Sequence, residues 1–495
     1  MTTPRPHVLW FGHPPGEATT RGLEERDLIP SVNPATVSSA EFSTATALVI
    51  ALGSEPASEQ DGAEMASLLK SALRHGLHCT LLAPLARIPN IKSFLRSLIF
   101  GSQIVLWEAG RELHVPEQVA RTSPGPPWKD TIEVSGEESL RDEDRILLRR
   151  AFHDCTTVSL VAETHGRSAQ VFCVYARLRD SAAGRLPLPF FAKFDRYPKI
   201  RRELKNYHDH TTVFIPFNQR PNLDPVRCML GAERGLIVGN FVEESETLGA
   251  LVERGTARAA IHSLFGGALR GWRTQTYFDD TMSVSSSIID SLPHCLPAAY
   301  RPPRSERVAA RALAARALGA SLSPKQLDAL LRQLPPLRHR LSMTHGDLHG
   351  ANVRVSHDEA ILIDFASTQV GPLMADPASL EVSLIMESRV LQGPEWEEFA
   401  KEMYELANLR TVPSPRDPAR REAPLWNSIR QLRQIALADE LSKFEYALTV
   451  AIYLLRRASY GSQADEPAGR RPMAYFLAER IAMQLTSELA CATAA

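Results

Sequence analysis

The chain has 495 residues, of which 44% are hydrophobic and 23% are charged, and its formal net charge at pH 7 is -1. A chain of this length exceeds what one compact core normally holds, so we expect two or three domains. The near-zero net charge provides no overall field that would steer the protein onto nucleic acid or an anionic membrane, so nucleic acid is not an expected partner.

Cysteine usage and apolar patterning indicate where the protein works. The sequence contains six cysteines and no Cys-x-x-Cys pair, which argues against a zinc site and a disulfide scaffold. Its first residues lack the basic segment and apolar core of a signal peptide, and no run of about 18 apolar residues occurs. We therefore expect a soluble, cytoplasmic protein with reduced thiols and no membrane partner.

Residues 1–115 alternate short apolar runs with a helical pattern. The pattern predicts a small α/β sandwich with a parallel sheet. It resembles the receiver or flavodoxin-like class, but the run that should carry a receiver's phosphate-accepting aspartate ends in Gly53 and Ser54. We therefore expect a degenerate receiver-like domain that could bind a protein partner. The expected strands are 7–12, 46–53, 78–84 and 103–110, and the expected helix is 59–76.

Residues 116–140 are rich in Pro, Gly, Ser and charge and have no sustained period, so we interpret them as a linker. Strand patterns follow at 156–163, 170–178 and 188–195, and a helical pattern follows at 198–210. Beyond residue 247, helical patterns dominate except around residues 340 to 370.

The stretch THGDLHGAN, residues 344–352, has little apolar bulk and precedes the apolar run AILIDFAST by one short loop. Asp347 in this loop could accept a hydroxyl proton or orient the hydroxyl group. Asn352 and Asp364 offer oxygen ligands suited to Mg²⁺, and a hairpin would bring them to the same end. Metal ligands and a positioned carboxylate are what phosphoryl transfer requires.

The motif His-Gly-Asp-Leu-His-x-x-Asn, followed about a dozen residues later by Ile-Asp-Phe, resembles the aminoglycoside phosphotransferase and choline kinase branch of the protein-kinase-like superfamily. Protein kinases usually have Arg and Gly where this chain has Gly346 and Ala366. Within the branch, the chain resembles kinase-like domains of bacterial conflict and signalling systems. The resemblance implies an α+β two-lobed kinase-like domain, with a strand-rich small lobe over residues 141–245 and a helical large lobe over residues 246–495.

The resemblance also implies roles for individual residues. Asp347 would be catalytic, and Asn352 and Asp364 would be the metal ligands. Lys193, a charge inside an apolar strand, would contact the α and β phosphates of ATP, with Glu203 orienting it.

Other positions in the small lobe would complete the nucleotide site. Backbone groups near Phe241 and Val242 would take the adenine edge. The phosphate-covering loop would contain a single glycine, Gly166, so Ser168 and backbone amides would cover the phosphates.

Structural alternatives exist for several of these residues. Asp347 and Asn352 could be ordinary turn residues, and Lys193 could extend from an edge strand into solvent. His345 is expected to brace its loop through hydrogen bonds. Asp376 is expected to be the N-cap of a helix.

The expected function is ATP- and Mg²⁺-dependent transfer of the γ-phosphate to a hydroxyl of a small molecule or protein, regulated by the amino-terminal domain. The predicted phosphate-covering loop contains only one glycine, so a second possibility is a nucleotide-binding pseudokinase that serves as a scaffold or sensor. Nucleotidyl transfer on the same fold is a third alternative. A cationic acceptor would require acidic residues, for which Asp279, Asp280 and Asp290 are the candidates.

Overall fold

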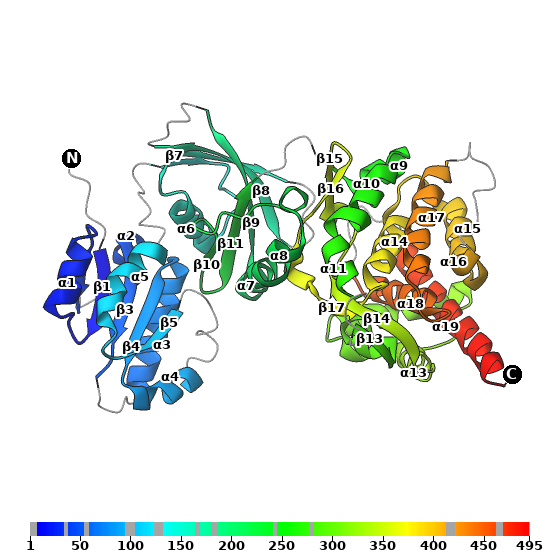
Figure 1. Ribbon diagram of the computed structural model, residues 1–495, viewed down its shortest axis with the longest axis horizontal. Helices are drawn as coiled ribbons and strands as arrows, with labels where there is room; N and C mark the ends of the chain where they lie inside the picture. The colour runs from blue at the N-terminus through cyan, green and yellow to red at the C-terminus, as the bar shows by residue number, and fades with distance from the viewer. Residues whose placement is uncertain are drawn as a thin grey trace. The chain divides into compact units, whose positions relative to one another are not determined.

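The computed structural model divides into two compact units, Met1–Lys205 with Asn222–Phe241 and Asn206–Pro221 with Val242–Ala495. The first unit contains two separate large sheets, whereas the second is mainly helical (Figure 1). No helix among the described residues is long and apolar enough to cross a membrane. The described residues are 7–33, 38–53, 59–94, 104–122, 132–163, 169–179, 186–240, 245–276, 282–411, 421–461 and 469–494.

The first sheet of the first unit is entirely parallel. Its order, β2-β1-β3-β4-β5, is one of the common orders of doubly wound sheets. The strands are β1 (His7–Gly12), β2 (Ile29–Val32), β3 (Ala45–Ala51), β4 (His78–Ala83) and β5 (Ile104–Glu108). The helices are α1 (Glu17–Glu24), α2 (Ser39–Thr44), α3 (Glu59–Arg74), α4 (Ile88–Phe94) and α5 (Val115–Thr122).

Helices cover both faces of this sheet, which explains why its central strands read as continuous apolar runs. Side chains alternate along a strand, so Leu9 and Leu48 pack on one face while Val8 and Val49 pack on the other. The first face is covered by α2, α3 and α4, and the second by α1 and α5.

The four predicted strands of this region are present and β2, which was not predicted, is added at the edge. The sequence of β2, IPSV, is short, contains proline and shows no alternation. The predicted linker, residues 116–140, includes most of α5 and the strand β6 (Glu133–Ser135), so it contains regular structure at both ends.

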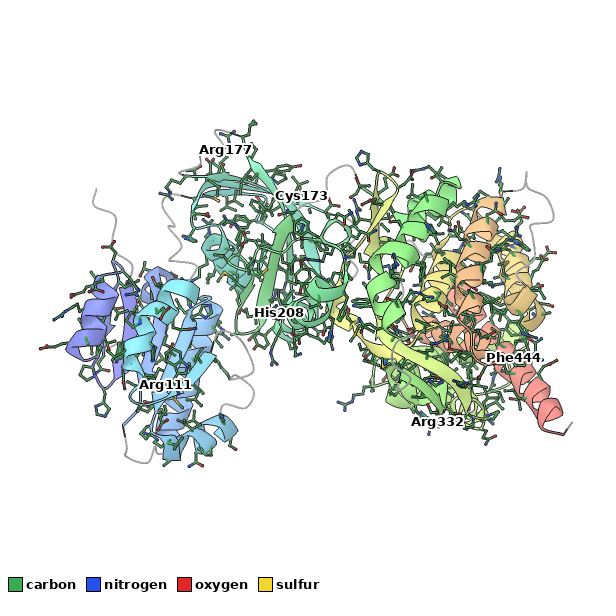
Figure 2. All side chains as sticks on the ribbon, viewed as in Figure 1. Arg111, Cys173, Arg177, His208, Arg332 and Phe444 are labelled. Carbon is green, nitrogen blue, oxygen red and sulfur yellow. The ribbon has the colours of Figure 1, made fainter. Side chains whose placement is uncertain are left out.

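The second sheet of the first unit is antiparallel except where β6 pairs with β7, and its order is β10-β11-β9-β8-β7-β6. The labelled Cys173 and Arg177 mark β8 in Figure 2. Its core includes Phe172 and Phe194, with Leu147 from the preceding helix. The remaining elements are β7 (Cys155–Ala162), β8 (Gln170–Leu178), β9 (Leu188–Arg196), β10 (Met229–Leu230), β11 (Arg234–Asn240), α6 (Asp142–Ala151) and α7 (Tyr197–Asn206).

A buried arginine of α6 joins the two sheet regions of the first unit. Arg150 is fully buried, and its guanidinium donates to the carbonyl oxygens of Ala45 at 2.9 Å, Phe42 at 2.7 Å, and His75. Burial lowers the pKa of Arg150 to about 9. The α/β sandwich and the antiparallel sheet therefore share a buried polar contact.

The second unit consists of helices and two small three-stranded sheets, β12-β15-β16 and β13-β14-β17. The strands are β12 (Glu246–Thr247), β13 (Ser283–Ser286), β14 (Leu337–Thr344), β15 (Val353–Ser356), β16 (Glu359–Leu362) and β17 (Gln369–Pro372). The helices are α8 (Thr212–Phe214), α9 (Leu248–Arg254), α10 (Arg258–Ser263), α11 (Arg270–Gln275), α12 (Arg304–Ala315), α13 (Pro324–Arg332), α14 (Ala375–Glu387), α15 (Gly393–Met403), α16 (Leu406–Thr411), α17 (Ala423–Ala438), α18 (Glu445–Ala458) and α19 (Arg470–Ala494).

Helix α18 is the centre of the second unit, and all of its residues are buried. Its sequence is apolar on most sides, as expected of a helix surrounded by other helices. Its charged residues lie at its two ends, Glu445 at the start and Arg456 and Arg457 at the C-terminal end, and all three are buried.

We expect Arg150→Met to lower the free energy of unfolding by about 3 kcal/mol or more, because three buried carbonyl oxygens lose a donor while the aliphatic volume is largely kept. Urea denaturation followed by circular dichroism measures the change. Arg145→Met on the same helix is the control, since the Arg145 ion pair with Asp142 is exposed and should contribute less than about 1 kcal/mol. Equal losses in the two variants would contradict this account of Arg150.

Candidate active site

The first group of predicted site residues lies in the antiparallel sheet of the first unit. Lys193 on β9 places its Nζ atom 2.8 Å from Oε2 of Glu203 on α7. Both residues are buried, with exposed fractions of 9% and 6%. Because β9 pairs with β8 on one side and β11 on the other, the alternative of an edge-strand lysine is wrong.

The other predicted nucleotide contacts lie outside the described residues. They are Gly166, Ser168, Phe241 and Val242. Their proposed roles stay predictions.

The second group lies on the loop that follows β14, and its conformation is fixed by buried polar contacts. The backbone amides of His345 and Gly346 donate to the Asp376 carboxylate at 2.9 and 3.3 Å. The His345 ring, fully buried, places Nε2 2.9 Å from the carbonyl oxygen of Ile363. His345 therefore has the contacts of a brace for the loop.

Gly346 is required by the shape of the loop. Its φ angle is +75°, and a Cβ atom at this position would lie 2.2 Å from the carbonyl oxygen of Ser367. A larger residue would therefore be strained and would also displace backbone.

We expected Asp376 to be the N-cap of α14, and this prediction is wrong. The N-cap is Met374, and Asp376 lies inside the first turn, where its carboxylate points to the loop amides. Burial raises the pKa of the Asp376 carboxyl, against the opposing effects of His345 and the two amide donors. The helix start thus serves to hold the loop.

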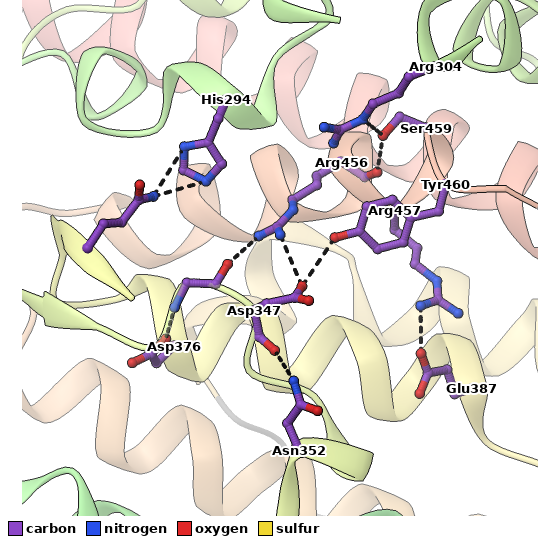
Figure 3. A network of polar contacts seen from close by, with 12 residues as sticks. His294, Arg304, Asp347, Asn352, Asp376, Glu387, Arg456, Arg457, Ser459 and Tyr460 are labelled. Carbon is purple, nitrogen blue, oxygen red and sulfur yellow. Dashed lines mark hydrogen bonds and ion pairs between the residues drawn. The ribbon is translucent and has the colours of Figure 1, made fainter. Parts of the chain in front are cut away.

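Asp347 is held by the end of α18 (Figure 3). Arg456 donates through Nη2 to Oδ1 of Asp347 at 3.0 Å and through Nη1 to the carbonyl oxygen of Gly346 at 2.7 Å. The hydroxyl of Tyr460 lies 3.4 Å from the same Oδ1 atom. The Asp347 side chain keeps 37% of its surface exposed, whereas that of Arg456 keeps 10%.

These contacts determine the charge state of Asp347. Partial burial raises the pKa of its carboxyl and Asp364 adds to this effect, but Arg456, His349 and His345 together outweigh them. The pKa of Asp347 consequently lies below its ordinary value. The carboxyl is therefore ionised at neutral pH, as an acceptor for a hydroxyl proton must be.

Asn352 and Asp364 lie at one end of the β15–β16 hairpin, as predicted. Val353 pairs with Leu362, and the amide of Ile363 donates to the carbonyl oxygen of Asn352 at 3.0 Å. Asp364 follows directly, in the left-handed region with φ 66° and ψ 71°. The hairpin therefore fixes the two positions through its register.

The Asn352 side chain is oriented by the loop itself. Its Nδ2 atom donates to the backbone carbonyl oxygen of Asp347 at 3.0 Å, and Oδ1 points away from that bond (Figure 3). An amide oxygen and a carboxylate are hard ligands of the kind that Mg²⁺ accepts alongside water and phosphate oxygens. No group of three or more His, Cys, Asp or Glu residues in the described part of the chain forms a metal cage.

Two of the residues that shape the site were not predicted from the sequence. Arg456 lies more than a hundred positions after Asp347, and Tyr460 follows it by one helical turn. The signal that could have revealed Arg456 is the pair of arginines at the end of a mainly apolar helix, because buried arginines need a partner.

One comparison with known families covers the second group of site residues, but not Lys193 and Glu203. A family model described as Ternary complex associated domain 9 matches residues 307–471, which include the loop, the hairpin and α18. No curated protein matches the chain.

The chain also has structural neighbours among small-molecule kinases. An amicoumacin kinase in complex with AMP-PNP and Ca²⁺ is 12% identical, with 70% of this chain and 94% of that chain covered and a TM-score of 0.37. A glucosamine kinase is 12% identical, with coverage of 67% and 94% and a TM-score of 0.32. A choline kinase from Cryptosporidium parvum Iowa II is 12% identical, with coverage of 68% and 91% and a TM-score of 0.32.

We expect Asp376→Ala to loosen the loop, because two buried amides lose their acceptor. Hydrogen–deuterium exchange of a peptide covering residues 344–352 should become faster, and the free energy of unfolding should fall by about 2 to 4 kcal/mol. The control is Ser383→Ala on the same helix, whose hydroxyl bonds only within its own turn. Unchanged exchange in Asp376→Ala would show that the carboxylate does not hold the loop.

Proposed function

We propose that the protein is an ATP- and Mg²⁺-dependent phosphotransferase that moves the γ-phosphate to a hydroxyl group of an acceptor. The observation that supports it is the loop around Asp347. One short segment presents an ionised, partly exposed carboxylate and, five residues later, an amide oxygen beside the Asp364 end of the hairpin. Phosphoryl transfer needs this combination of a positioned carboxylate and hard metal ligands.

The residues of the second unit would have separate roles in the reaction. Asp347 would orient the acceptor hydroxyl and take its proton. Asn352 and Asp364 would hold Mg²⁺, which when bound neutralises charge on the phosphates. Arg456 would keep the Asp347 carboxylate in one orientation.

The residues of the first unit would serve the nucleotide. Lys193 would contact the α and β phosphates, and Glu203 would orient the lysine through the 2.8 Å ion pair. Gly166 and Ser168 would cover the phosphates. Backbone groups of Phe241 and Val242 would bind the adenine edge.

The amino-terminal sandwich would be a degenerate receiver-like regulatory domain that binds a protein partner. The Arg150 contacts support a regulatory link, because they connect the sandwich to the helix that leads into the antiparallel sheet. We place the protein in the cytoplasm of a bacterium, as one of the kinase-like proteins of signalling or defence systems.

A second candidate is a pseudokinase that binds nucleotide as a scaffold or sensor. It is favoured by the Arg456 contact, since a carboxylate that already accepts hydrogen bonds from arginine and tyrosine is a weaker base. Transfer of a nucleotidyl group is the remaining alternative. In that case the acceptor gains AMP instead of phosphate, which mass spectrometry of the product distinguishes.

Nucleotide binding should require a divalent metal, and Asp364→Ala should weaken Mg²⁺–ATP binding more than Asp347→Ala does. The reason is that Asp364 is proposed to contact the metal, whereas Asp347 acts on the acceptor. Isothermal titration calorimetry with and without Mg²⁺ measures both effects. Equal ATP affinity in the presence and absence of Mg²⁺ would be incompatible with the proposed site.

Asp347→Asn should reduce turnover about a hundredfold or more with ATP affinity nearly unchanged, because the shape is kept and the proton-accepting charge is lost. The assay is transfer of label from γ-labelled ATP to components of a cell extract. Asp358→Asn is the matched control, because Asp358 is exposed in the turn of the β15–β16 hairpin at φ 67°. Full transfer by Asp347→Asn would show that the carboxylate has no catalytic role, whereas no transfer by either the unmodified protein or the variant would favour the scaffold.

A further inference from the structure

Three segments of the second unit contribute polar side chains to the region around Arg456, which pairs with Asp347. His294 comes from a single turn at Pro293–Cys295, Arg304 begins α12, and Tyr460 follows α18 (Figure 3). These three residues and Asp347 are all half-buried, so each keeps a solvent-accessible portion. Tyr460 links the two ends of this set, because its hydroxyl lies 3.4 Å from Oδ1 of Asp347 and its ring centroid lies 5.7 Å from the guanidinium carbon of Arg304.

The arginines of this region differ in whether a carboxylate neutralises them. Arg456 pairs with Asp347, and Arg457 pairs with Glu387 at 2.6 Å. Arg304 has no carboxylate partner within the described residues.

Arg304 is held in place by uncharged groups. Its Nε atom donates to the Ser459 hydroxyl at 2.7 Å, and its guanidinium carbon lies 3.9 Å from the ring centroid of Tyr300. Its Nη2 atom is buried and makes no hydrogen bond within the described structure. The guanidinium is thus oriented, charged and short of an acceptor.

A second arginine of α12 also contacts Ser459. Arg307 donates through Nε to the carbonyl oxygen of Ser459 at 3.2 Å, and it too pairs with no carboxylate in the part of the chain that the structure describes. Two guanidinium groups therefore converge on Ser459, and the hydroxyl of Ser459 itself donates to the carbonyl oxygen of Arg456 at 2.5 Å.

The charge state of His294 is set by its burial and by the neighbouring charges. Burial, together with the charges of Arg456 and Arg304, lowers the pKa of His294 to about 4 against the opposing charge of Asp347. At neutral pH the ring is uncharged. It adds no positive charge, and its ring nitrogens lie 3.2 and 3.1 Å from Nε2 of Gln369.

Of the three acidic residues proposed to receive a cationic acceptor, only Asp290 lies in the part of the chain that the structure describes. Asp290 has 70% of its side chain exposed and lies 3.8 Å from Arg332. The other two candidates, Asp279 and Asp280, lie outside the described residues. A cationic acceptor would be repelled by the guanidinium of Arg304, which an anionic acceptor would neutralise.

We propose that the acceptor is a hydroxyl compound that carries a carboxylate or phosphate group, and that Arg304 binds this anion while Asp347 orients the hydroxyl. Arginine suits this role because its planar donors match the oxygens of a carboxylate or phosphate. Arg307 adds to the positive potential. This inference rests on the proposed phosphotransferase function and specifies the class of its substrate.

The acceptor class can be tested with the full chain, γ-labelled ATP and Mg²⁺. The probes are small-molecule fractions of a cell extract, separated into those retained by an anion exchanger, those retained by a cation exchanger and those retained by neither. We expect labelled product from the anionic fraction. Product from only the cationic or neutral fraction would overturn the inference and keep the phosphotransferase, whereas no product from any fraction would count against both.

Variants then test Arg304 itself on the active fraction. Arg304→Gln should raise the KM for this fraction about tenfold or more, because a charge-assisted hydrogen bond is lost, and should leave the KM for ATP unchanged. Arg304→Lys should restore part of the loss. Arg307→Gln should give a smaller increase, and Arg316→Gln, at an exposed position after α12, should give none.

A purely structural role for Arg304 would give a different pattern. Arg304→Gln would then lower thermal stability and kcat while leaving the KM for the anionic fraction unchanged. That result would overturn the assignment of Arg304 as the anion-binding residue.

Discussion

The Asp376 carboxylate is the contact on which the geometry of the site depends. It accepts the amides of His345 and Gly346 from within the first turn of α14. A buried carboxylate without these donors would be costly, and two buried amides without an acceptor would be costly as well. The loop and the helix therefore determine each other, and the position of Asp347 follows from both.

Arg456 holds the loop from the opposite side. It contacts the carbonyl oxygen of Gly346 and the carboxylate of Asp347, so the loop is fixed between the start of α14 and the end of α18. A site whose charged groups are already oriented has little reorganisation left to make when substrates bind. Both helices are buried, which makes these anchors rigid.

The same contact has a chemical consequence. Arg456 keeps Asp347 ionised, but it also makes the carboxylate a weaker base. Phosphoryl transfer tolerates this, because it depends mainly on positioning and on neutralising charge. The arrangement therefore suits an orienting carboxylate better than a strong base.

Local patterns accounted for the parts of the site that are close in sequence. The loop and the hairpin could be predicted because Asn352 and Asp364 are separated by two short strands whose register follows from their spacing. The Lys193–Glu203 pair could be predicted because a strand leads directly into the helix that bears Glu203.

Contacts between residues that are far apart in the sequence could not be predicted from local patterns. Arg456 and Arg150 act through packing between segments far apart in the chain, and Asp376 has the sequence context of a helix cap. The apolar neighbours of Arg456 indicate that it is buried, but no local pattern identifies the distant atoms to which a buried arginine donates.

The central claim is that Asn352 and Asp364 hold the metal of a nucleotide-dependent phosphotransferase. The most direct test is a crystal structure of the protein with Mn²⁺ and a non-hydrolysable ATP analogue, in which anomalous scattering locates the metal. The account predicts an anomalous peak within coordination distance of Asn352 Oδ1 and the Asp364 carboxylate, with phosphate oxygens completing the shell. A metal bound away from both residues, or a nucleotide bound without metal, would contradict it.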